Sequence, residues 1–172
     1  YYQHQGNEHY NLYVKTSKKA YIYQLLAGAS DENSVATGGM NFIPALSCFL
    51  PKSIDEIGLI DQNRIYSNNN TFGIDNIPTK LNIITEKGAK VTINGSTPNN
   101  RFGPFPIIGN RNWETYSIPD QKGNVTIISD KAVTAGIIAG SDAAGYGGFF
   151  AGLPTQPSIV REGCCPNATL KV

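Results

Sequence analysis

Apolar residues along this chain recur at every second position in short runs, the pattern of β-strands with one buried face. The clearest case is residues 124–139, NVTIISDKAVTAGIIA, which predict a strand, a tight polar turn and a second strand running back. Residues 132–139 are apolar on both faces, as expected of a central strand covered on both sides. A glycine-rich segment follows, and we expect it to place Phe149 and Phe150 one on each side of the sheet.

The same design occurs near the start of the chain. The pairs Lys19-Ala20 and Lys131-Ala132 are each followed, after four residues, by a matching segment, LLAG at 25–28 and IIAG at 137–140. The repeat predicts a front hairpin in which Leu12 and Val14 face the core, residues 16–19 turn, and residues 20–26 run back. A third hairpin is predicted over residues 81–94, with its turn at 86–89 and with Leu81, Ile83 and Val91 or its neighbours facing the core.

The remaining segments complete an all-β interpretation. Residues 113–118 read as a strand, and residues 41–51, which carry two prolines, as an edge strand or an extended crossing segment. Residues 53–60 fit a strand or a helical turn, and residues 62–76 read as a long polar loop. No stretch of a dozen residues shows a capped helical period. Because a lone hairpin is marginal in water, we predict an antiparallel β-sandwich, with a jelly roll as one form of it.

We place this sandwich domain at residues 1–156, with residues 157–172 as a linker and the start of a following module. The first residues look like a cut through a longer polypeptide.

Composition and charge limit the kinds of partner that the chain could bind. The net charge is +1 and 16% of residues are charged, without a Lys/Arg run, which argues against nucleic-acid binding. Apolar runs are only a few residues long, so no transmembrane helix is expected. The three cysteines, Cys48, Cys164 and Cys165, allow at most one plausible disulfide, from Cys48 to either neighbour; a partner outside the chain or free thiols fit equally well. They indicate an extracellular compartment only weakly.

Catalytic patterns are missing from the sequence. His4 and His9, with Glu8 between them, would lie on opposite faces of a strand. There is no G-x-S-x-G elbow and no phosphate-binding loop. The carboxylates are scattered, mostly at turns: Asp55, Glu56, Asp61, Asp120, Asp130 and Asp142. We therefore predict no enzyme and no metal centre. Calcium is the one cofactor that loop oxygens could hold, at Asp31, Glu32, Asn33 and Asp142, although the EF-hand spacing is absent.

Two further groups of residues concern carbohydrate: asparagines that could carry a glycan, and aromatic residues that could contact a ligand. Four sequons occur, at Asn69, Asn94, Asn124 and Asn167, and matter only if the source cell glycosylates asparagine. Aromatic residues could form a carbohydrate-stacking platform, against the alternative that they pack in the core. The wider aromatic set includes Tyr21, Tyr23 and Phe42. The speculative ligand-binding residues gather around the Pro/Gly-rich excursion and near the chain's end: Phe102, Phe105, Trp113, Tyr116 and Tyr146.

Five segments carry a family resemblance: LYVKTSKKAYIYQLLAG, TGGMNFIPALSCFLP, NWETYSIP, GNVTIISDKAVTAGIIAG and GYGGFFAGLP. Together they resemble the IgGFc-binding protein N-terminal domain family, and more closely its bacterial members in large surface and secreted proteins. The resemblance runs over most of residues 10–154, and a family member would start earlier than this chain does. The tail, PSIVREGCCPNATLKV, looks like the step into an Ig-like module.

The resemblance implies a non-catalytic adhesion or binding module at the cell surface or outside the cell, tethered to further domains. Its expected partners are glycans or glycoproteins, without nucleic acid and without membrane insertion. No family site motif can be matched here residue by residue. The alternatives are a carbohydrate-active enzyme or its carbohydrate-binding appendage, and a structural spacer.

Overall fold

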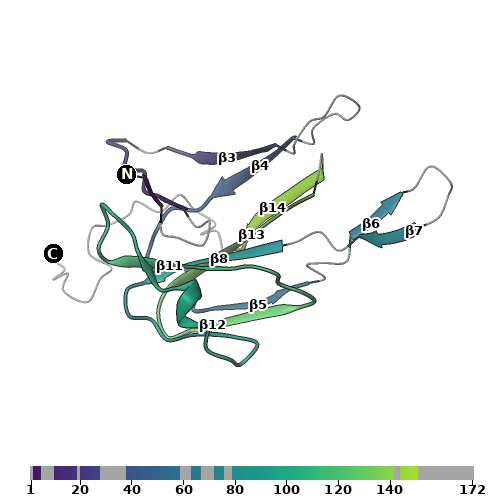
Figure 1. Ribbon diagram of the computed structural model, residues 1–172. Helices are drawn as coiled ribbons and strands as arrows, with labels where there is room; N and C mark the ends of the chain where they lie inside the picture. Colours follow the sequence, from purple (N-terminus) through teal and green to yellow (C-terminus); the bar gives the residue numbers. More distant parts are fainter. Residues whose placement is uncertain are drawn as a thin grey trace, which may run out of the picture.

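Strands make up nearly all the regular structure of the described residues. The computed structural model describes residues 2–4, 10–18, 20–27, 38–58, 63–66, 72–75, 79–141 and 144–150 (Figure 1). The strands are β1 (Tyr2–His4), β2 (Tyr10–Leu12), β3 (Ile22–Ala27), β4 (Gly38–Ile43), β5 (Ser53–Ile57), β6 (Asn63–Tyr66), β7 (Phe72–Asp75), β8 (Thr79–Glu86), β9 (Val91–Ile93), β10 (Phe105–Pro106), β11 (Trp113–Ile118), β12 (Val125–Ser129), β13 (Val133–Ser141) and β14 (Ala144–Phe150). One short 3-10 helix, η1, spans Asn100–Phe102. In this part of the chain no helix is long and apolar enough to cross a membrane.

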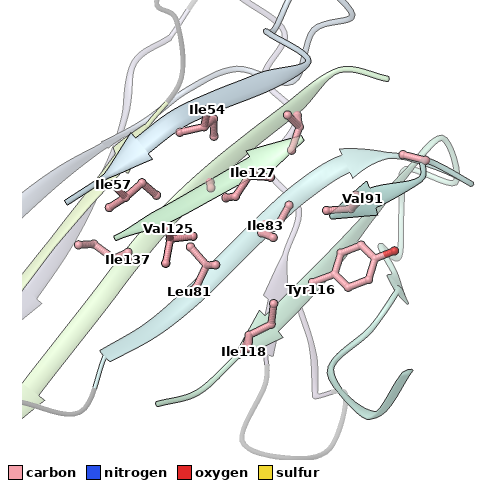
Figure 2. Packing of buried hydrophobic residues seen from close by; sticks show 13 residues of the cluster. Ile54, Ile57, Leu81, Ile83, Val91, Tyr116, Ile118, Val125, Ile127 and Ile137 are labelled. Carbon is pink, nitrogen blue, oxygen red and sulfur yellow. The ribbon is translucent and has the colours of Figure 1, made fainter. Parts of the chain in front are cut away.

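Two antiparallel sheets face each other. The larger has the order β10-β11-β8-β13-β14 and the smaller the order β5-β12-β9. Buried side chains from both sheets form one cluster between them, shown in Figure 2. The prediction of an all-β antiparallel sandwich is therefore confirmed. The cluster comprises Ile54, Ile57, Ala89, Val91, Val125 and Ile127 from the smaller sheet and its turns, and Leu81, Ile83, Tyr116, Ile118, Val133, Ala135 and Ile137 from the larger sheet.

β8 lies at the centre of the larger sheet, and its side chains alternate strictly in burial. Its odd-numbered residues from Thr79 to Thr85 are fully buried, while the even-numbered ones are half-buried. Leu81 and Ile83 therefore face the core, as predicted, and Val91 joins them from β9. β13 lies between β8 and β14, which confirms the prediction of a central strand at 132–139.

Two of the predicted hairpins are not hairpins. The chain does turn tightly between β8 and β9, where Gly88 has φ of 70°, but β8 pairs with β11 and β13 while β9 pairs with β12. Likewise β12 and β13 belong to different sheets. Each segment is an arch that carries the chain across the sandwich. Hairpins and arches share alternating strands and a polar turn, so the local pattern cannot separate them. Here the two strands join different sheets, and their buried side chains pack against each other across the sandwich, which makes each segment an arch.

The front of the chain also pairs differently from the prediction. β2 pairs with β1, and β3 pairs with β4. Leu12 and Val14, expected in the core, are 66% and 46% exposed, whereas Asn11 is buried. The Asn11 side chain is held because its Nδ2 donates to Thr115 Oγ1 in the larger sheet, 2.9 Å away. The face of β2 that turns inward is thus the one that carries this hydrogen bond to β11.

Residues 62–76, predicted as a loop, contain the antiparallel pair β6–β7. Residues 53–57 form a strand, which resolves the choice left open there. Residues 41–51 begin in β4 and then cross the far face of the larger sheet. There Leu50 is buried with Ile107, Trp113 and Ala132, and Leu46 packs against this second cluster.

The sequence repeat marks two equivalent hairpins, β3–β4 and β13–β14. Aligning the repeat places Leu26 on Ile138, and these residues pair with Gly39 and Gly147. Phe150 packs against the main core, whereas Phe149 pairs with Gly136 and its ring lies beside that glycine on the opposite face. The two rings therefore take opposite sides of the sheet, as predicted.

Candidate functional site

The five aromatic residues predicted as a ligand surface differ in how far they are buried. Trp113 and Tyr116 are each only 7% exposed, one in each buried cluster. Phe102 packs against the main core, with the Arg101 guanidinium 4.4 Å from its ring centre. Phe105 is half-buried in β10, and Tyr146 lies in β14 with its side chain outside the described residues. A ligand-binding role stays a prediction for this set, in which Phe102 and Phe105 are half-buried while Trp113 and Tyr116 leave little ring surface to a ligand.

Two exposed aromatic residues, Tyr21 and Tyr23, lie together at the β3–β4 hairpin, whereas Tyr10 and Phe49, also exposed, lie outside it. Tyr21 is 73% exposed and Tyr23 51%, and both rings contact the ring of Phe42, at centroid distances of 5.9 and 5.7 Å. Leu25 and Met40, opposite each other in the register, continue the same face and are 78% and 64% exposed. We call these five residues the hairpin aromatic face. The wider aromatic set in the sequence contained three of them, but the sequence does not indicate which rings would remain uncovered.

A cavity of about 290 Å³ lies between β4 and β14. These strands come together in space, with the β3–β4 hairpin lying beyond β14 on the side away from β8 (Figure 1). In the sheets of the described residues, however, β4 is bonded only to β3, and β14 only to β13. The residues that line this β4–β14 cavity are Met40, Asn41, Phe42, Pro44, Gly147, Gly148 and Phe149, and none of them is ionisable.

One buried polar group in the cavity wall lacks a partner. Asn41 is 5% exposed, and its side-chain Nδ2 makes no hydrogen bond. Opposite it in the register is Gln24, whose Oε1 is also without a partner. Buried amides are normally satisfied, so an unpaired one is unusual in a folded protein. Sequence reasoning missed Asn41, and the only available signal was a polar residue inside an otherwise apolar strand.

Three of the described carboxylates accept hydrogen bonds that join separate segments. Asp130 Oδ1 accepts a hydrogen bond from the backbone N–H of Lys90, 2.7 Å away, and Glu56 Oε1 accepts one from Asn124 Nδ2. The buried Glu114 accepts one from the backbone N–H of Gly88, which ties β11 to the arch. The pKa of the Tyr116 phenol is raised above its ordinary value, mainly because the phenol is buried. The negative charge of the nearby Glu114 raises this pKa further.

The metal candidates can be placed only in part. No group of three His, Cys, Asp or Glu side chains in the described ranges is arranged to hold a metal ion. Glu8 and His9 lie outside the described residues, as does the suggested calcium set, Asp31, Glu32, Asn33 and Asp142. Cys48 is half-buried and forms no disulfide with any residue that the structure describes, and Cys164 and Cys165 are not among these, so the cysteine pairing stays open.

Two sequon asparagines, Asn94 and Asn124, have side chains that form hydrogen bonds; that of Asn124 donates to Glu56. Asn94 Nδ2 donates to the carbonyl of Asn124, and its Oδ1 accepts from the N–H of Thr126. These bonds fasten the end of β9 to β12. Asn69 and Asn167 lie outside the described residues, and glycosylation of any sequon remains a prediction.

Comparison with known proteins adds a functional class. The family model described as IgGFc binding protein matches residues 1–139. No curated protein and no solved structure matches the chain. The matched residues cover the sandwich core, the hairpin aromatic face and most of β13. The family description refers to binding, so the coarse functional class is a binding module.

Proposed function

This chain belongs to the IgGFc-binding protein family, and from that premise we propose that it is a non-catalytic adhesion module of an extracellular or cell-surface protein. Its partners are glycoproteins or their glycans. The observation that carries the proposal is the hairpin aromatic face, a set of apolar side chains of which four are exposed, with the rings of Tyr21 and Tyr23 packed against the half-buried ring of Phe42. Exposed apolar patches of this kind are typical of interaction surfaces.

The chemistry of this face suits a glycoprotein. Its five members carry no formal charge, and its tyrosines combine an apolar ring with a hydroxyl that can reach a polar partner. Alternation in β3 supports a surface role: Tyr21, Tyr23 and Leu25 are exposed, while Ile22 and Gln24 on the opposite face are half-buried. A sheet face turned to the solvent normally carries polar residues. Apolar residues here therefore point to a surface that another molecule covers.

The test is binding of the purified domain to a glycan array, to immobilised mucin and to IgG Fc. The double variant Tyr21→Ser/Tyr23→Ser is expected to weaken binding by about tenfold or more, because exposed aromatic anchors dominate such interfaces. The matched control is Ile128→Ser, which removes another exposed apolar side chain, 54% exposed on β12. Thermal unfolding checks that all three proteins fold equally.

Each outcome decides between function classes. Binding that survives the double variant overturns the hairpin aromatic face as the contact surface. If the unmodified domain binds no member of the panel, the spacer alternative replaces adhesion. Hydrolysis of a bound glycan would favour the carbohydrate-active enzyme.

A further inference from the structure

We propose that the β4–β14 cavity binds a single neutral sugar residue of a glycoprotein partner. The inference rests on the proposed function and specifies its ligand class and site. It assigns a role to a cavity, to a strand edge that pairs with no other described strand, and to a buried amide that the sandwich core does not use.

The size of the cavity limits the ligand. Pockets for drug-sized molecules enclose roughly 300–1,000 Å³ and cover most of the ligand. At about 290 Å³, the β4–β14 cavity lies just below this range. Its volume therefore suits one ring-sized group, such as one sugar residue of a glycan.

The hydrogen-bonding groups in the wall favour a polar ligand. The Asn41 Nδ2 is a buried donor without an acceptor, and leaving it so costs free energy that a bound oxygen atom would recover. Gly147 and Gly148 belong to β14, whose edge towards β4 makes no ladder of hydrogen bonds in the described residues. Without side chains, these glycines let a ligand approach the backbone closely. A sugar hydroxyl, which donates and accepts, matches amide and backbone groups alike.

The rest of the wall favours a neutral ring. Phe42 and Phe149 supply aromatic surface, and Met40 and Pro44 supply aliphatic surface. Because the described wall residues include no cation, an acidic sugar would lose its hydration without gaining a counter-charge from them. A neutral sugar has no such penalty, and its C–H groups can lie against the rings.

The cavity is continuous with the proposed contact surface. Met40 and Phe42 both line the cavity and belong to the hairpin aromatic face. A sugar residue bound between β4 and β14 would therefore lie at the margin of the surface that contacts the rest of the partner. One interface would thus recognise both a glycan residue and its carrier.

The experiment is an NMR titration of the whole isotope-labelled chain with methyl glycosides. Neutral hexosides and N-acetylhexosaminides form one arm, and a sialoside forms the other. The expected result is saturable shifts of the Asn41 side-chain amide and of the Gly147 and Gly148 backbone amides with a neutral glycoside only. Asn41→Leu is expected to raise Kd by about tenfold or more, without lowering the melting temperature, because it removes an unpartnered buried amide.

Thr134→Val is the matched control. Thr134 is fully buried on β13, and its Oγ1 also lacks a hydrogen-bond partner, but it does not line the cavity. Its removal is expected to leave glycoside affinity unchanged. If the bulk of leucine prevents folding at position 41, Asn41→Ala removes the same donor and is expected to show the same loss.

Several results would overturn the proposal. These are the absence of shifts with any glycoside, equal affinity of the Asn41 variants, and shifts with free apolar side-chain analogues alone, which would identify a pocket for a partner's side chain. If glycoprotein binding persists undiminished after enzymatic deglycosylation, the sugar site is overturned while the proposed adhesion function stands. Loss of all glycoprotein binding by the unmodified domain would instead remove the proposed function.

Discussion

At the scale of single residues, Gly136 shows how a missing side chain sets the packing of a strand pair. A Cβ at this position would lie 2.9 Å from Cε1 of Phe149 and 3.0 Å from the carbonyl oxygen of Gly148. Real Cβ atoms do not approach so closely, so either the ring or the backbone of β14 would have to move. The glycine thus allows Phe149 to lie across β13 while Phe150 fills the core.

We expect Gly136→Ala to lower the free energy of unfolding by about 1–3 kcal/mol through this overpacking. Urea denaturation measures the change. Gly148→Ala is the control: its Cβ would lie 3.9 Å from Cζ and 4.0 Å from Cε2 of Phe150, which are ordinary contacts, so stability should change by less than about 1 kcal/mol. Equal stability of the Gly136 variant and the unmodified protein would show that the ring moves aside freely.

At the scale of elements, the arrangement depends on contacts that join distant strands. β2 is held to β11 by the side chains of Asn11 and Thr115, both buried and 104 positions apart. This polar contact on the far side of the larger sheet fixes which face of β2 is covered. It also explains why apolar residues of β2 remain exposed.

Thr115→Val should therefore destabilise the fold by about 1–3 kcal/mol, because the Asn11 amide loses its partner while it stays buried. In the double variant with Asn11→Leu, the loss should be smaller than the sum of the single losses. Urea denaturation of the four proteins gives the coupling energy. Strictly additive losses would mean that the Asn11–Thr115 bond does not tether β2.

At the scale of the whole molecule, the two sheets bury one continuous cluster, and Tyr116 carries the ionisable group of that cluster (Figure 2). Burial and the nearby Glu114 charge raise its pKa above the ordinary value of 10.0. The neutral phenol is the form that the folded state favours. Stability from this group is therefore complete below the unfolded pKa and is lost as the pH rises through the folded pKa.

We accordingly expect the free energy of unfolding to fall between about pH 8 and about pH 11, and Tyr116→Phe to reduce that fall, since phenylalanine does not ionise. Urea denaturation at both pH values compares the two proteins, and other tyrosines contribute equally to each. An identical pH dependence in the variant would show that the Tyr116 phenol ionises as easily in the fold as in the unfolded chain.

Much of the element content could be predicted from the sequence. The strand at 113–118, the central strand after Lys131-Ala132, the inward positions of Leu81 and Ile83, and the opposed rings of Phe149 and Phe150 all follow from alternation along a few residues. The family resemblance likewise depends on the order of short motifs, and residues 1–139 match the family. Such features are local, because each side chain's face is set by its position in its own strand.

Only the tertiary structure decided which strands pair and which rings remain uncovered. Turns at Gly88 and after Ser129 look alike in a hairpin and in an arch, and the choice depends on sheets built from strands far along the chain. Trp113 and Tyr116 are buried while Tyr21 and Tyr23 are exposed, although all four lie in or beside strands. The physical reason is that alternation determines which way a side chain points. What lies over that side chain depends on non-local packing.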